Sequence, residues 1–180
     1  VNDRSPLRVL FPQFWRIDSM VRGEVEDVEA AALDWTSERY GWSSWSIRQQ
    51  ASHLASLVYR WLVTRWGDKV FSDGAPVSDD ELLLLNSPEH DRRLNDEAYY
   101  EVDAILGAAE GAIELARSVL QRRTVEEGRS LTVTRPSSEQ WALMAMAHPH
   151  GVTVNPAGGG TLTLEATFRH MYFEYMTHIY

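Results

Sequence analysis

Apolar residues recur at helical spacing in four long stretches of this chain, and no other feature constrains its fold as strongly. The stretches run from Ile17 or Asp18 to Ala32, from Ser46 to Trp66, from Asn95 or Asp96 to Arg122, and from Thr161 or Thr163 to Tyr180. We therefore predict an all-α fold, a four-helix bundle formed by one domain over residues 1–180. Two of the connections are long, so we expect crossovers and not a simple up-down-up-down order.

The two long connections differ in character. Residues 67–94 are rich in Gly, Pro, Asp and Ser, which indicates a mostly irregular crossover. Residues 124–160 predict a small irregular or β-containing insertion between the third and fourth helices. Its expected parts are a short strand at Leu131–Val133, a short helix at Glu139–Ala147, an extended piece at Val152–Val154, and a flexible Gly-rich turn and hinge ending at Gly160.

Composition excludes several classes of protein. A formal net charge of −9 argues against a nucleic-acid partner and against an anionic membrane surface, because both need clustered Lys and Arg. The chain has no cysteine, which excludes disulfides, thiolate metal ligands and a cysteine nucleophile. No apolar run approaches a membrane span, and the first residues do not resemble a secretory signal. We expect a cytoplasmic protein.

The last helix carries a candidate metal-binding pattern. His170, Glu174 and His178 stand at i, i+4 and i+8, so on a helix they stack along one side. Imidazole and carboxylate groups one turn apart can share a metal ion. The second helix adds His53, on the flank of its apolar stripe. If the two helices pack side by side, three or four ligands converge.

The start of the second helix is also encoded. Ser46 and Gln49 fit a capping box, in which the hydroxyl and the Gln side chain each satisfy a backbone N–H of the first turn. This capping box predicts that the second helix begins at Ser46.

The remaining histidines lie outside the predicted helices. His148 and His150 flank a proline in a turn and form a second candidate site, although a pH-sensitive or purely structural turn is the favoured interpretation. His90 reads as a loop residue. Gly158–Gly160 precedes a helix but lacks a following Lys-Ser/Thr, so it does not predict a phosphate-binding loop.

Several motifs resemble the DinB-like (YfiT-like) metalloprotein superfamily. They are Leu33-Asp34-Trp35, then Gly41-Trp42-Ser43-Ser44-Trp45-Ser46-Ile47-Arg48, and then His53-Leu54. In that superfamily the histidine of the second helix is a metal ligand, and the last helix carries an H-x-x-x-H pair. Here Glu174 and His178 occupy the place of that pair, so a glutamate replaces the usual middle histidine.

Helical geometry chooses between the registers that this substitution allows. His178 lies beside the apolar stripe of the last helix, Glu174 about 40° further round and His170 about 80° further round. The register of His170 with Glu174 and that of His170 with His178 are therefore less favourable. We predict His53, Glu174 and His178 as the metal ligands, with His170 behind them or at the surface.

The resemblance implies a divalent metal, with zinc as the first choice and nickel, iron or manganese as alternatives. It also implies a small-molecule substrate and a thiol-dependent transferase or isomerase that uses a low-molecular-weight thiol, or else a metal-dependent hydrolase. No catalytic residue is assigned, and a homodimer is expected. One rival interpretation is a non-catalytic bundle that binds a small molecule or dimerises. Another is a degenerate site in which the glutamate marks the loss of the metal.

Overall fold

The computed structural model describes residues 1–179, except for the side chain of Trp42, and the chain is mainly helical, as predicted. The chain divides into two compact units, residues 1–12 with 117–174 and residues 13–116 with 175–180. Two helices, α6 (Val102–Arg122) and α9 (Leu164–Ile179), pass unbroken from one unit into the other. The single-domain organisation and the four-helix bundle stay predictions.

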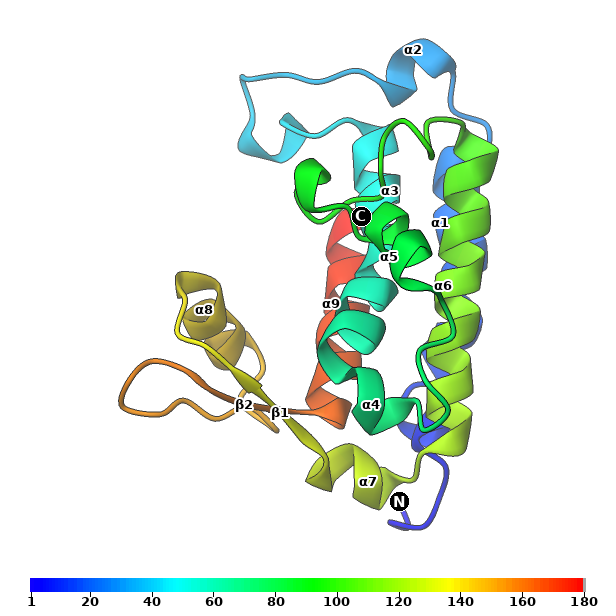
Figure 1. The fold of residues 1–180 in the computed structure, drawn as a ribbon. Helices are drawn as coiled ribbons and strands as arrows, with labels where there is room; N and C mark the ends of the chain where they lie inside the picture. Colours follow the sequence, from blue (N-terminus) through cyan, green and yellow to red (C-terminus); the bar gives the residue numbers. More distant parts are fainter. Residues whose placement is uncertain (180) are drawn as a thin grey trace. The chain divides into compact units, whose positions relative to one another are not determined.

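The larger unit is built around α3 (Ile47–Val58), which continues into a π-helix, η4 (Tyr59–Trp66). Every residue from Ala51 to Val63 is buried, so from Ala51 onward α3 is enclosed on all sides and not only along one stripe. Helix α1 (Ile17–Val25) packs against α3 (Figure 1) and contributes buried aliphatic side chains to the same core. The unit also contains η2 (Pro12–Trp15), α2 (Ala30–Leu33), η3 (Gly41–Ser43), α4 (Gly67–Val70), α5 (Asp79–Leu85), η5 (Pro88–His90) and most of α6.

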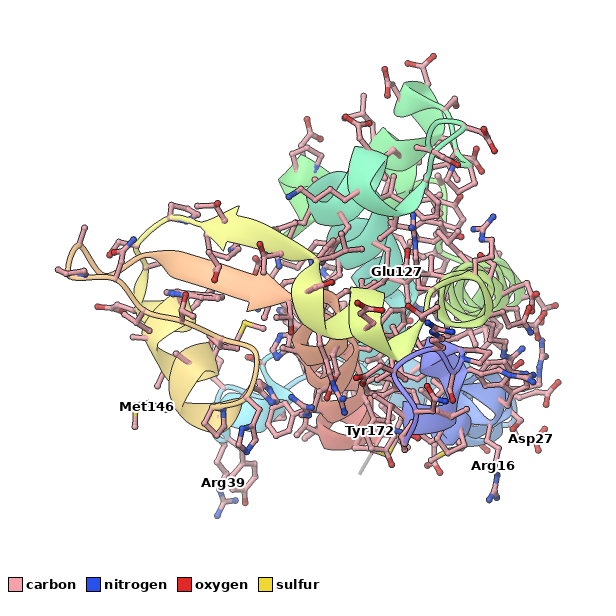
Figure 2. The ribbon with its side chains drawn as sticks, turned by 90° about the horizontal axis from the view of Figure 1, so that it is seen from below. Arg16, Asp27, Arg39, Glu127, Met146 and Tyr172 are labelled. Carbon is pink, nitrogen blue, oxygen red and sulfur yellow. The ribbon has the colours of Figure 1, made fainter. Side chains whose placement is uncertain are left out.

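The smaller unit holds the predicted insertion. Its strands β1 (Thr132–Arg135) and β2 (Gly160–Thr163) pair antiparallel, with Thr132 opposite Thr163. Helix α8 (Glu139–Ala147) joins them and lies beside the resulting ribbon (Figure 1). Buried Trp141 anchors α8, while Met146 projects away from it into solvent (Figure 2). The other elements are η1 (Leu7–Leu10), α7 (Val125–Ser130) and the first part of α9.

Two predicted helix limits were wrong, the end of the first helix and the start of the third. The first helix ends at Val25 and not at Ala32, because Glu29 has an extended ψ of 140° and a separate helix, α2, follows it. The third begins at Val102, since the Asn95 side chain accepts the N–H groups of Glu97 and Ala98 in a separate turn. The cap of the fourth helix was predicted at Thr161 or Thr163, and Thr163 is correct: α9 begins at Leu164, and the Thr163 hydroxyl accepts the N–H of Ala166 over 3.1 Å. Its predicted end at Tyr180 lies outside the described residues.

The extended segments of the insertion also differ from prediction. Strand β1 starts one residue later than expected, at Thr132. The piece expected to be extended at Val152–Val154 forms no strand of its own but pairs with β2, through an antiparallel bridge from Val152 to Leu162 and a hydrogen bond from the N–H of Thr153 to the carbonyl of Thr161 over 2.9 Å. Gly160 opens β2 and is not a hinge before the helix. A Cβ atom at Gly160 would lie 1.7 Å from the carbonyl oxygen of Thr153, so only glycine fits this close approach.

Candidate metal centre

The capping box at the start of α3 is present as predicted. The Ser46 hydroxyl accepts the N–H of Gln49 over 3.2 Å, and the Gln49 side chain accepts the N–H of Ser46 over 3.1 Å. This pair satisfies two backbone N–H groups and fixes where α3 begins. Gln50 and His53 follow on the next turns of the helix.

His53 is buried, with 1% of its surface exposed, and one of its ring nitrogens already has a partner. Its Nδ1 atom lies 3.0 Å from the carbonyl oxygen of Arg92. A carbonyl oxygen only accepts hydrogen bonds, so Nδ1 carries the proton and Nε2 of the neutral ring carries the lone pair. The ring also packs against Trp45, with centroids 5.1 Å apart, which restricts its rotation.

An unusual backbone conformation presents the Arg92 carbonyl to His53. Asp91 and Arg92 have φ angles of +39° and +65°, and they are the only non-glycine residues with positive φ among those the structure describes. Such conformations are sparsely populated and occur most often at functional sites. The buried Arg60 donates from Nη1 to the same carbonyl over 3.3 Å, so two side chains of the α3–η4 helix share this acceptor.

His178 has the same arrangement as His53. Its Nδ1 atom lies 2.5 Å from the amide oxygen of Gln50, one turn before His53 on α3. The amide oxygen is an acceptor, so Nδ1 is the donor and Nε2 is again the atom able to bind a metal. The two imidazole rings lie 4.8 Å apart between centroids. Both histidines are therefore held in the tautomer typical of metal ligands.

Glu174 completes the group. His53, Glu174 and His178 each offer a ligand atom, and these atoms all lie within 4.8 Å of one another. Glu174 is the last residue of the smaller unit, but it precedes His178 by one turn of the unbroken helix α9, so the helix itself sets their spacing. Within residues 1–179 this is the one group of three such side chains.

The donor set fits a divalent metal ion. Two imidazole nitrogens and one carboxylate are a common ligand set for zinc in catalytic sites, and also for ferrous iron. Ligand atoms about 2.1 Å from one tetrahedral zinc ion lie about 3.4 Å apart, so atoms as far as 4.8 Å apart must approach each other by up to about 1.4 Å to close the group. Rotation about the side-chain bonds of Glu174 supplies a movement of this size.

The other predicted candidates lie elsewhere. His150 is exposed on the turn after α8, and the His90 ring contacts the hydroxyl of Ser87 over 2.7 Å. His148 is buried, and its Nε2 atom lies 3.1 Å from Nδ1 of His170. Burial lowers the pKa of His148, and the nearby His170 and Arg169 lower it further. Neither His148 nor His150 belongs to a group of three ligands in the described part of the chain.

A cavity of about 240 Å³ opens beside His178, whereas His53 and Glu174 do not line it. His178, Gln50 and Glu24 form its polar wall. The apolar wall is formed by Val21, Val25, Ile47, Ala51, Leu54 and Ile179. The volume lies below the range of about 300–1,000 Å³ usual for pockets of drug-sized ligands, so the cavity has room only for a small molecule.

Sequence reasoning missed two groups that hold the histidines. Gln50 precedes His53 by three residues on α3, and this helical spacing was the one available signal for it. The Arg92 carbonyl gave no signal, because its position depends on positive φ angles at an Asp and an Arg, which do not usually adopt them.

Comparison with known proteins gives no relative for this chain: no family model, no curated protein and no solved structure matches it. Among the described residues, no helix is both long enough and apolar enough to cross a membrane.

Proposed function

We propose that this protein binds one divalent metal ion through Nε2 of His53, Nε2 of His178 and the carboxylate of Glu174. The observation that carries the proposal is the pair of Nδ1 contacts, to the Arg92 carbonyl and to Gln50. Each contact places the proton on Nδ1 and leaves the lone pair on Nε2, the nitrogen available to a metal ion. Two histidines that lay close together by chance would not need such an acceptor at each Nδ1.

The proposed metal is zinc, with nickel, iron or manganese as alternatives that the same ligands accept. Three protein ligands leave a coordination position open, as in catalytic zinc sites, whereas a structural site has a fourth protein ligand. When bound, such a metal lowers the pKa of a coordinated water or thiol and so supplies a nucleophile near neutral pH.

We further propose that the chain is a DinB-like enzyme acting on a small molecule. The cavity beside His178 supports this proposal, because its apolar wall can hold the apolar part of a small molecule next to one of the proposed ligands. Gln50 borders the cavity and holds the His178 ring in place. Transfer of a low-molecular-weight thiol is the first reaction to test, and hydrolysis is the second.

Metal analysis of the untagged protein tests the proposal. Near-stoichiometric metal should be lost in His53→Ala, Glu174→Ala and His178→Ala, and retained in the control variants His90→Ala and His150→Ala. Metal lost only when His148 or His150 is replaced would move the site to the turn after α8. Absence of metal under every loading condition would favour a non-catalytic binding module.

Assays of the metal-loaded protein then separate the two reactions. Conjugation of an electrophile that requires an added thiol supports the transferase. Ester or amide cleavage without a thiol supports the hydrolase. In either case the His53→Ala variant is the matched inactive control.

A further inference from the structure

A second pair of histidines stands behind Glu174, and the proposed metal site does not use it. His170 Nε2 lies 3.2 Å from Glu174 Oε1, one turn along α9. On the other side of the same ring, His170 Nδ1 lies 3.1 Å from His148 Nε2. His148, His170 and Glu174 therefore form a continuous chain of polar contacts within the smaller unit.

The chemistry of the carboxylate sets the direction of this chain. An ionised carboxylate only accepts hydrogen bonds, so His170 Nε2 must carry a proton. When the His170 ring is neutral it holds a single proton, which leaves a lone pair on His170 Nδ1. His148 Nε2 then donates to that lone pair. In this neutral form of the two rings, each proton position follows from the neighbouring one, starting from Glu174.

The surroundings hold both rings in place. His148 caps the C-terminal end of α8, and its backbone N–H donates to the carbonyl of Met144 over 2.9 Å. Arg169 on α9 donates to the carbonyl of His150 over 3.0 Å, which ties the turn after α8 to the helix. Phe173 packs against His148 with ring centroids 5.5 Å apart. The His148 side chain is thus buried against α9 and restricted in its movement.

We propose that His170 and His148 are positioning residues for Glu174. His170 orients the carboxylate toward His53 and His178, and His148 holds His170 in the tautomer that does so. The inference rests on the proposed function, because the carboxylate is oriented for metal binding. Partners that hold ligand side chains in this way typically contribute about 10- to 100-fold to metal affinity.

Zinc affinity, measured by competition with a chromophoric chelator, tests the proposal. His170→Leu removes the donor to Glu174 and should weaken binding by about 10- to 100-fold. His170→Gln keeps an amide donor at a similar reach and should restore most of the affinity. The control is His150→Leu, which removes an exposed histidine from the turn after α8.

A double-mutant cycle tests the role of His148. His148→Leu should weaken zinc binding in the wild-type background, but not in the His170→Gln background, where no tautomer has to be selected. Thermal unfolding of each variant shows whether it is folded. Long-range ¹H–¹⁵N spectra of the wild-type protein provide a readout that needs no variant, and they should show protons on Nε2 of both His148 and His170.

Four results would overturn the inference, and the last of them would also overturn the proposed function. In one such result, His170→Leu binds zinc as tightly as the wild-type protein while His53→Ala loses binding. The metal site would then be correct, but His170 and His148 would not position Glu174. A proton found on Nδ1 of His170 instead of Nε2 would contradict the chain of contacts. A second equivalent of zinc that is lost in His170→Leu would make the pair ligands of another metal ion. If the wild-type protein binds no metal, the proposed function fails together with this inference.

Discussion

The hydroxyl of Tyr175 on α9 donates a hydrogen bond to the carbonyl oxygen of Leu54 on α3 over 3.1 Å. Tyr175 is fully buried, and its ring meets Phe14 edge-on with centroids 6.4 Å apart. Leu54 directly follows His53, and Tyr175 lies three residues before His178. This hydrogen bond therefore joins the two helices at the level of the candidate metal centre.

Tyr175→Phe should lower the free energy of unfolding by about 1 kcal/mol, because it removes one buried hydrogen bond while keeping the ring. It should also weaken metal binding, since α9 loses a fixed point beside His178. Urea unfolding and chelator competition measure the two effects. Tyr172→Phe, on a half-buried side chain of the same helix (Figure 2), is the control and should change neither quantity.

Gln50→Leu should weaken zinc binding by about 10-fold or more, because the His178 ring loses the acceptor that fixes its tautomer. Gln50→Glu keeps an acceptor at the same position and should bind zinc at least as tightly as the wild-type protein. Gln140→Leu changes an exposed glutamine on α8 and serves as the matched control. Equal affinities in the Leu and Glu variants of Gln50 would show that this contact does not support the centre.

Two substitutions of Arg92 test the backbone that holds His53. Both Arg92→Gly and Arg92→Val remove the guanidinium, but only glycine adopts a φ of +65° readily. We expect the Val variant to be less stable than the Gly variant by about 1–2 kcal/mol. It should also bind zinc more weakly, because its carbonyl turns away from His53.

The same pair of substitutions at Glu89 is the control, since φ at that position is not positive. A Val variant of Arg92 with the stability and zinc affinity of the Gly variant would show that the positive φ angle is not needed to place the carbonyl.

Alkaline pH should destabilise the fold through its buried tyrosines. Burial raises the pKa of Tyr59 to about 12 from its ordinary value of 10, and burial also raises the pKa of Tyr175. Below pH 10 the stabilisation is fully present. Between pH 10 and 12 the unfolded chain loses the Tyr59 proton while the folded protein keeps it. The free energy of unfolding should therefore fall by about 1.4 kcal/mol per pH unit for this residue.

Urea unfolding at about pH 9, 10 and 11 measures this dependence. Tyr59→Phe should reduce the slope above pH 10, whereas Tyr40→Phe, at an exposed position, should leave it unchanged. An unchanged slope in Tyr59→Phe would show that Tyr59 ionises alike in the folded and unfolded states.

Local signals in the sequence predicted parts of the fold and of the site well. Helix α8 has the predicted limits, Glu139 and Ala147, and the capping box of Ser46 and Gln49 is present. Both depend on residues close together in the chain, where side-chain and backbone preferences act directly. The meeting of His53 with His178 also followed from a local property, the side of each helix on which the histidine lies.

Features set by tertiary contacts were not predicted. Strand β2 was read as the end of a flexible turn, because its pairing with β1 depends on residues about thirty positions away. The contact of His148 with His170 depends on how the turn after α8 is tied to α9 by Arg169. The acceptors of the two histidines, Gln50 and the Arg92 carbonyl, become recognisable only when the ring orientations are known.

X-ray absorption at the zinc edge of the zinc-loaded protein tests the central claim most directly, because it reports the ligands of the metal itself. We predict two imidazole ligands and a carboxylate oxygen in the first shell, at about 2.0–2.2 Å. In His53→Ala, one imidazole should be lost. A first shell of oxygen atoms without imidazole scattering, or a spectrum that His53→Ala leaves unchanged, would contradict the assignment of His53, Glu174 and His178 as the metal centre.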